Sequence, residues 1–261
     1  MKTIKSFSFI TFVFMAFSAF GQTNAEIEQE LVGHIKAIQK WSAYGNDYNE
    51  ALLSKENAIF KEKLLKYTKM ASTLKYKFSE LDKYLYLSTS EDGKFRIYSW
   101  DTEDGGTMHN FENVYQFQGN DGKVYSKSSD LEEGDAGAFV SDIFDIDTSK
   151  GKVYLARFSS ILSNADAYQS INLFKIEDNS LDDKIKLIKT KSGLRSSLGF
   201  EYDFFSVVDR AERPIKLILY DKETKTIKIP VVIVDKDFRN GRVTGKFINY
   251  KFDGTYFLKQ K

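Results

Sequence analysis

The chain contains no cysteine. This absence excludes disulfides, a cysteine nucleophile, thiolate zinc sites and iron–sulfur ligation. It also excludes a lipid anchor on a cysteine near Gly21. The fold must therefore be held by its core, and the roughly 240 residues after Gly21 bury enough apolar surface for one domain, or for a domain with an appendage.

Histidine is nearly absent too, with only His34 and His109 in the chain. A two-histidine metal centre or a histidine-dependent triad therefore has few possible members. There is no G-x-S-x-G nucleophile elbow, no phosphate-cradling glycine motif and no dinucleotide fingerprint. We predict no cofactor and no metal, and we consider a binding protein better supported than an enzyme.

Long apolar runs are missing after residue 21. The first 21 residues have the pattern of a signal peptide, with Lys2 and Lys5 before the apolar "SFSFITFVFMAF" and small residues at Ala19 and Gly21. Cleavage near Gly21 would send the mature chain to the periplasm or outside the cell, with no transmembrane segment. An uncleaved anchor is the alternative, but the apolar run is shorter than the ~20 residues that a span needs.

Excess charge of one sign is also lacking, because the formal net charge is +1. We therefore expect no nucleic-acid partner. The distribution is uneven, with twelve acidic residues against two lysines in 101–147, and twelve basic residues against five acidic ones in 213–261. These segments either neutralise each other as neighbours, which is the simpler interpretation, or form a bipolar surface.

Residues 22–82 have a helical pattern. Thr23-x-x-Glu26 resembles a capping box and is followed by an apolar stripe at helical spacing. After a break at Gly45, Asp47-x-x-Glu50 is a candidate cap for a second helix, whose stripe runs from Phe60 to Phe78. We predict a helical hairpin that buries one stripe per helix.

Residues 83–261 have the period of two that is typical of strands. Thirteen short runs rich in β-branched and aromatic residues alternate with turn signals such as "SEDG", "GNDG" and "RNG". Parallel strands need long crossover connections, which are usually helical, and no helical segment separates these runs. We therefore predict an antiparallel β domain. The overall fold class is α+β and mainly β: the hairpin packed on a sandwich or barrel, with an open propeller-like meander as the alternative. Pro230 predicts an edge or a bulge in its strand.

The stretch 99–110, "SWDTEDGGTMHN", is the best candidate site. His109, Asp101 and Asp104 offer an acid and base pair or oxygen ligands, and Gly105-Gly106 would let a ligand approach the backbone. The competing interpretation is a turn between two strands, in which glycine meets a demand for positive φ.

Two other features are weaker candidates. Asp145-x-Asp147-x-Ser149 begins like a calcium loop, but Lys150 precedes Gly151 and Ala156 stands where a bidentate Glu belongs, which favours a hairpin. Aromatic residues along the strands are candidates for stacking on a ligand such as a glycan, and we select Trp100, Tyr98 and Tyr115. Core packing explains aromatic strands equally well.

A resemblance adds to this interpretation. "DGKFRIYSWDTEDGGTM", "VYQF", "GKVYLARF" and "YQSINLFKI", within residues 91–177, resemble an arrangement in uncharacterised exported proteins of Gram-negative bacteria. The resemblance implies export and no particular activity.

Together these features predict an exported, non-catalytic envelope or secreted module that binds a protein or a glycan. The alternative is a hydrolase-type enzyme, possibly metal-assisted, with its site in the Asp101–His109 loop. The enzyme requires that loop to cover a pocket in which His109 meets a carboxylate. A His109 that points outward on a free hairpin tip would contradict it.

Overall fold

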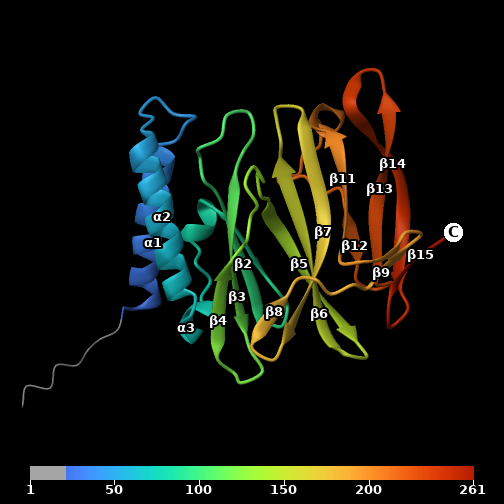
Figure 1. Cartoon of the computed structure of the whole chain (residues 1–261), viewed down its shortest axis with the longest axis horizontal. Helices are drawn as coiled ribbons and strands as arrows, with labels where there is room; N and C mark the ends of the chain where they lie inside the picture. Colours follow the sequence, from blue (N-terminus) through green and yellow to red (C-terminus); the bar gives the residue numbers. More distant parts are fainter. Residues whose placement is uncertain (1–21) are drawn as a thin grey trace, which may run out of the picture.

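The computed structural model describes residues 22–261, so the predicted signal peptide lies outside the described residues. Within this part the protein is an α+β structure that is mainly β, as predicted. An N-terminal helical hairpin is followed by three sheets that lie side by side in Figure 1. The sheets form an open, sandwich-like stack and do not close into a barrel.

The helices are α1 (Asn24–Lys40), α2 (Glu50–Tyr67) and the single-turn α3 (Ala71–Leu74), followed by the 3-10 turn η1 (Leu81–Lys83). The predicted capping box at Thr23 and Glu26 is confirmed, because both of its hydrogen bonds are present. The predicted cap at Asp47 is wrong: Asn49 caps α2 by accepting from the Leu52 amide. The second helix also ends at Tyr67 and does not extend to Phe78, which adopts φ 50°.

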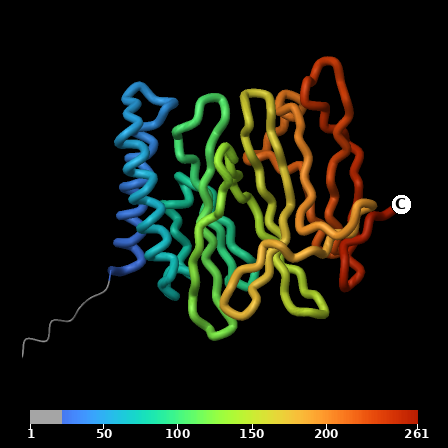
Figure 2. Tube along the Cα trace, in the orientation of Figure 1, coloured from blue at the N-terminus to red at the C-terminus, as the bar shows by residue number. Residues whose placement is uncertain are grey.

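The first sheet has the strand order β1-β2-β3-β4, and the second has the order β11-β7-β6-β5 with β8 paired to β7. The third has the order β10-β9-β15-β14-β13-β12, and its β15–β9 pair is the one parallel pairing among residues 22–261. Figure 2 shows the chain passing from the helices through the three sheets, with β9 and β10 preceding the return to β11. The strands are β1 (Tyr86–Thr89), β2 (Phe95–Asp101), β3 (Phe111–Gln118), β4 (Val124–Ser128), β5 (Phe139–Thr148), β6 (Gly151–Ile161), β7 (Asp166–Glu177), β8 (Ser180–Asp182), β9 (Ile188–Thr190), β10 (Gly193–Arg195), β11 (Ser197–Asp203), β12 (Leu219–Asp221), β13 (Thr226–Asp235), β14 (Phe238–Phe252) and β15 (Phe257–Lys259).

One predicted strand is shorter than its sequence run. The run "GFEYDFFSVV" leaves the sheet after Asp203, whose carboxylate accepts from the Phe205 amide and begins the 3-10 turn η2 (Phe204–Val207). The prediction for Pro230 is confirmed. The β13–β14 register shifts between Pro230 and Val232, and β12 pairs with β13 only as far as Lys228.

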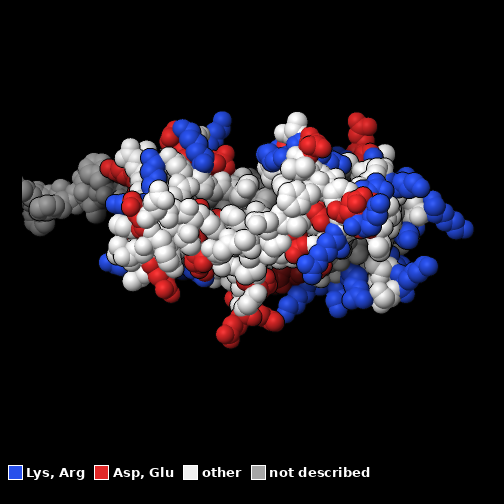
Figure 3. Space-filling model, turned by 90° about the horizontal axis from the view of Figure 1, so that it is seen from above, with Lys and Arg blue, Asp and Glu red and all other residues white. Residues whose placement is uncertain are grey.

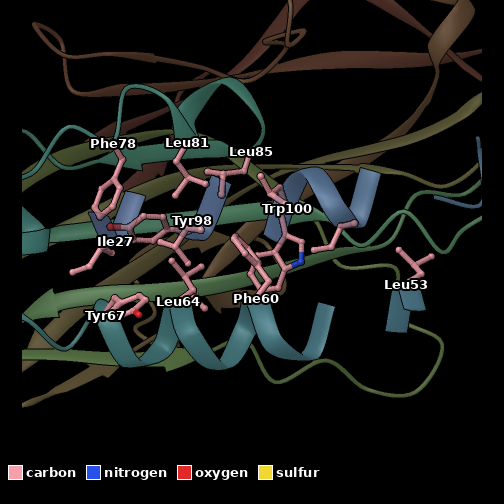
Figure 4. Packing of buried hydrophobic residues seen from close by; sticks show 14 residues of the cluster. Ile27, Leu53, Phe60, Leu64, Tyr67, Phe78, Leu81, Leu85, Tyr98 and Trp100 are labelled. Carbon is pink, nitrogen blue, oxygen red and sulfur yellow. The ribbon is translucent and has the colours of Figure 1, made fainter. Parts of the chain in front are cut away.

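A separate core fills each gap between layers. The α1 and α2 stripes pack on Tyr98, Trp100 and Val114 of the first sheet, as Figure 4 shows in part. Phe95 and Ile97 alternate with those side chains and face the second sheet. Further clusters lie between the second and third sheets. The helical hairpin thus shares its core with the first sheet.

The charged segments do not neutralise each other as neighbours. Among residues 22–261, a single ion pair, Lys216–Asp142 at 3.0 Å, joins the basic segment to the acidic one. In the view from above, Lys and Arg side chains gather at the right-hand end, where Figure 1 places the third sheet (Figure 3). The surface is therefore more bipolar than the simpler interpretation predicts.

Candidate functional site

The candidate loop connects β2 to β3 and spans residues 102–110. It is closed by the Thr102 amide, which donates to the Asn110 carbonyl at 2.9 Å. Asp104 holds the loop from inside, because its Oδ1 accepts from the Thr102 hydroxyl at 2.6 Å and from the side-chain Nδ2 of Asn110 at 2.9 Å. Asp104 therefore shapes the loop and is not hydrogen-bonded to His109.

Glycine does not have the role predicted for it in this loop. Glu103 is the residue with a positive φ, at 60°. The φ angles of Gly105 and Gly106 lie outside the left-handed region. A Cβ on Gly105 would lie 1.9 Å from the Met108 carbonyl oxygen, while a Cβ on Gly106 would meet nothing within 4 Å. Gly105 is thus needed for a close approach within the loop itself.

The loop is fastened to two other layers and is not a free hairpin tip. The Ser42 hydroxyl, at the end of α1, donates to the Glu103 carboxylate at 2.7 Å, and the Ala43 amide donates to the Glu103 carbonyl at 2.8 Å. On the other side, the His109 amide donates to the Ile161 carbonyl at the end of β6, at 3.0 Å. The loop therefore bridges the helical hairpin and the second sheet.

The structure brings His109 and Asp101 together as a hydrogen-bonded pair through His109 Nδ1. The other Asp101 oxygen accepts from the Glu103 amide at 2.8 Å. The imidazole stacks on Tyr44, with ring centroids 4.7 Å apart. Within residues 22–261 no hydrogen-bond partner lies at Nε2, and the His109 side chain is 33% exposed.

Burial and neighbouring carboxylates raise the pKa values of two groups near this pair, Glu103 and Tyr44. Burial raises the pKa of Glu103, and the nearby Asp101 charge adds to the rise, while the Ser42 hydroxyl and His109 oppose it. Burial also raises the pKa of the Tyr44 phenol, helped by Asp101 and Glu103. Tyr44 is therefore a neutral phenol at any physiological pH.

His109 lies where two cavities meet, of about 560 and about 370 Å³. The larger one is lined by residues 82–88, which run from η1 into the edge strand β1, and it reaches Asp101. The smaller one is mostly apolar. We call the two together the His109 groove; the residues that line both cavities are Tyr86, His109, Ile161 and Pro214.

The predicted aromatic ligand contacts divide into two kinds. Tyr98 and Trp100 are fully buried between the helices and the first sheet (Figure 4), so neither ring presents a surface that a ligand reaches. The Trp100 indole instead donates to Asn57 Oδ1 at 3.1 Å. Tyr115 lies on the opposite face of the first sheet, toward the second sheet, and lines a different cavity.

Serines along the groove do not complete a triad. The hydroxyl of Ser88 donates to the Val140 carbonyl at 3.0 Å, and that of Ser160 donates to the Gly137 carbonyl at 2.7 Å. Ser141 donates to Asp142, Ser159 accepts from Gln169, and Ser163 accepts from backbone amides. None of these serines is hydrogen-bonded to His109.

No metal site is found in the described part of the chain: no group of three or more His, Asp or Glu side chains is placed to hold an ion. His34 pairs with Glu56 at 2.8 Å, on the helices. The calcium-like segment is the predicted hairpin, in which Thr148 pairs with Gly151. Asp145 there accepts from the backbone amides of Glu91 and Asp92.

The comparisons with known proteins give no match to a family model, to a curated protein or to a solved structure. Among residues 22–261, no helix has both the length and the apolar composition that crossing a membrane requires.

Sequence reasoning missed two parts of the groove. Tyr44 was not selected, although its ring stacks on His109. Tyr86 was not selected either, although it stacks on Phe139 at 4.0 Å and lines both cavities. The aromatic run "YLYLS" was the available signal for Tyr86, but nothing in it shows that the strand is at an edge.

Proposed function

We propose that the chain is an exported, non-catalytic module that binds an extended polypeptide segment in the His109 groove. Export is supported by the signal-peptide pattern of residues 1–21 and by the resemblance over residues 91–177. The observation that carries the binding proposal is the position of the groove, which follows the free edge of β1 and opens at His109 into an apolar cavity.

An edge strand offers backbone groups to another strand. β1 pairs with β2 on one side only, and three of its four residues, Tyr86, Leu87 and Ser88, line the larger cavity together with the preceding residues 82–85. Extended peptides bind such edges by strand addition, with main-chain hydrogen bonds supplying affinity. A glycan has no comparable match to a row of amides and carbonyls, and we therefore favour a polypeptide.

The edge is protected in the unbound chain. Burial raises the pKa of Asp82, and the Leu87 amide opposes the rise. A carboxyl group beside an edge amide is one means by which an edge avoids uncontrolled pairing. An incoming strand must displace Asp82, so Asp82→Ala is expected to tighten peptide binding.

The smaller cavity supplies selectivity. Its walls include Tyr86, Phe139, Tyr202 and Phe204, and a volume of about 370 Å³ accommodates one large apolar side chain. Alternate side chains of a bound strand point the same way, so a residue of the peptide can enter this cavity while its neighbours face away. We expect an aromatic or large aliphatic residue at that position.

The test is selection of peptides from a displayed random library on the purified protein. The exposed Thr107 lines the smaller cavity, so Thr107→Trp fills it, and Thr255→Trp, in the exposed turn before β15, is the matched control. We expect peptides with one large apolar residue that bind wild type and T255W and lose at least tenfold in affinity for T107W. Absence of enriched peptides, or equal binding to T107W, would contradict the proposal, as would T107W-sensitive binding of glycans alone.

Export is tested separately by producing the full chain in a bacterial host. Mass spectrometry of the released protein is expected to find a terminus at Gln22. Retention of residues 1–21 on a membrane-bound product would support the anchor instead.

Hydrolysis is a second candidate, favoured by the His109–Asp101 pair. An imidazole oriented by a carboxylate is the usual arrangement of a general base. Because the groove serines are bonded elsewhere, the attacking group would be a water molecule held at Nε2. Incubating the selected peptide with wild type and with His109→Gln distinguishes the two functions. Cleavage of the peptide by wild type but not by the variant would identify the protein as a hydrolase and not a binding module.

A further inference from the structure

The outer face of the third sheet is not covered by any other layer of residues 22–261. The helices cover the first sheet, and the second sheet lies between the first and the third. The third sheet ends the stack, at the right-hand side of Figure 1. Side chains on its outer face therefore meet solvent or a partner.

Strand pairing identifies the residues on this face. Phe257 opposes Phe252 and Ile188, and all three pack in the core toward the second sheet. Successive side chains of a strand alternate between the two faces, so the residues next to such core positions point outward. We call the following six outward residues the third-sheet face: Lys189, Lys228, Lys251, Leu194, Leu219 and Phe247.

The third sheet carries a large excess of positive charge. The two segments that build it, 184–195 and 213–261, contain 17 basic residues against five acidic ones. The other residues of 22–261 contain 19 basic and 32 acidic ones. Figure 3 shows the Lys and Arg side chains gathered at this end of the molecule. The protein is therefore a strong electric dipole whose positive pole is the third sheet.

Acidic residues of the same sheet do not neutralise this charge. The two that lie within its strands are already paired, Asp221 with Lys228 at 3.2 Å and Asp235 with Arg242 at 2.6 Å. The other three lie in the turns between strands. Among residues 22–261, no ion pair is made by Lys189 or Lys251, and both are exposed. Their charges are available to a partner.

Apolar side chains lie among the lysines of this face. Leu194, Leu219 and Phe247 are 40%, 39% and 38% exposed. Leu194 directly opposes Lys189, and Leu219 directly opposes Lys228. A soluble polyanion would contact the lysines alone. The surface of an anionic bilayer offers phosphates to the lysines and an apolar boundary to the side chains between them, so its chemistry matches the whole face.

We propose that the third-sheet face docks on the surface of an anionic lipid bilayer. The lysines contact headgroup phosphates, and Leu194, Leu219 and Phe247 enter the boundary between headgroups and acyl chains. None of the six residues lines the His109 groove, so a docked molecule keeps that groove open. Docking does not depend on peptide binding.

The test is sedimentation of the purified chain with vesicles of phosphatidylglycerol mixed with phosphatidylcholine, and with vesicles of phosphatidylcholine alone. We expect binding to the anionic vesicles in about 0.1 M salt and release in about 0.5 M salt, because salt screens the lysine charges. Binding to the neutral vesicles is expected to be at least about tenfold weaker.

The diagnostic variant is Lys189→Glu combined with Lys251→Glu. One basic residue near an anionic surface contributes roughly fivefold in affinity, so this variant is expected to lose at least about twentyfold. Lys55→Glu combined with Lys69→Glu changes the net charge equally at exposed positions of the helical hairpin and is the matched control. We expect the control to lose less than about threefold. Replacing Lys189 and Lys251 with Gln repeats the comparison without charge reversal.

The apolar contribution is tested with Phe247→Asn, which is expected to weaken vesicle binding about fivefold. Tyr48→Asn, at an exposed aromatic residue on the loop between the helices, is the control with no expected effect. Circular dichroism and the Tm of each variant confirm that it is folded.

Equal binding to anionic and neutral vesicles, or equal losses in K189E/K251E and K55E/K69E, would overturn the proposal. So would dextran sulfate binding as tight as vesicle binding together with no effect of F247N, because the partner would then be a soluble polyanion. Self-association without vesicles that K189E/K251E abolishes would make a second copy of the chain the partner and would overturn it as well.

Discussion

The imidazole of His109 stacks on the ring of Tyr44, with the centroids 4.7 Å apart and the planes inclined by 26°. This contact joins the loop after α1 to the loop after β2, two segments that are distant in sequence. It fixes the orientation of the imidazole from the face, while Asp101 fixes it from Nδ1.

Replacing Tyr44 with Ala is expected to lower the free energy of unfolding by about 1 kcal/mol, the usual value of an aromatic pair beyond its buried area. The selected peptide should bind more weakly, because His109 lines the groove. Urea unfolding and the peptide dissociation constant are the measurements. Tyr48→Ala is the control, since Tyr48 is 51% exposed and belongs to no aromatic pair among the described residues. Equal effects of both substitutions would contradict the role of the stack.

Gly105→Ala is expected to destabilise the chain by about 2 kcal/mol, because its Cβ would meet the Met108 carbonyl at 1.9 Å and the loop must shift. Gly106→Ala, one residue further, has open space and should change stability by less than about 0.5 kcal/mol. Thermal unfolding of the two variants is the comparison. A similar loss in both would mean that the loop needs flexible glycines and not a close approach.

Glu30 should stabilise the helical hairpin in a pH-dependent way. The hydrogen bond from Lys63, followed by that from Tyr67, lowers the pKa of Glu30 to about 2. A lowered carboxyl pKa contributes stability above the unfolded value of 4.5 and loses it as the pH falls toward 2. Because the carboxylate is 26% exposed, we expect Glu30→Gln to cost only about 1 kcal/mol at pH 7.

The difference between Glu30→Gln and wild type should close between pH 4.5 and pH 2, as measured by chemical unfolding across that range. Glu80→Gln removes an exposed pair with Lys83 and serves as the control with little effect at any pH. A constant difference for Glu30→Gln would show that packing, and not charge, explains its effect.

The contribution of Glu103 to stability should change with pH in the opposite direction to that of Glu30. Burial raises the pKa of Glu103, so its contribution to stability is fully present below 4.5 and is lost as the pH rises through the folded-state pKa. Glu103→Gln retains an acceptor for Ser42 and carries no charge. We expect this variant to be about 1 kcal/mol more stable than wild type at pH 7 and equal to it near pH 4. Lower stability at pH 7 would mean that the ionised carboxylate is needed in the loop.

Glu28 is expected to be the most sensitive carboxylate of α1. It is 6% exposed and accepts from the Glu80 amide at 2.7 Å, the Leu81 amide at 3.1 Å and the Tyr76 hydroxyl at 2.9 Å. Glu28→Leu leaves these donors unpaired, with an expected cost of about 3 kcal/mol in urea unfolding. Glu50→Leu, at the exposed start of α2, is the comparison. Equal unfolding midpoints would contradict the role of Glu28 as a cap for η1.

The sequence was enough to predict the elements that depend on local pattern. The capping box at Thr23 and Glu26 satisfies backbone donors within one turn, and the hairpin after Asp147 requires only turn chemistry. The irregularity at Pro230 follows from a missing amide donor. None of these features depends on a residue far away in the chain.

Features that depend on distant partners were not predictable in this way. The apolar residues from Phe60 to Phe78 recur with a continuous helical period, yet α2 ends at Tyr67. The hydroxyl of the next residue, Thr68, donates a hydrogen bond to the Leu64 carbonyl. Trp100 was a candidate ligand contact, but its strand lies beneath the helices, which alternation alone does not reveal. In the candidate site, the Asp101–His109 pair is predictable because the two residues are close in the sequence. The positions of Tyr44 and Tyr86 and the edge position of β1 depend on tertiary packing.

Hydrogen exchange of the β1 amides, measured with and without the selected peptide, tests strand addition most directly. We predict that the peptide slows exchange at the outward amides of β1, Leu87 among them, and that T107W abolishes this protection. Peptide binding that leaves the exchange of β1 unchanged would contradict the account.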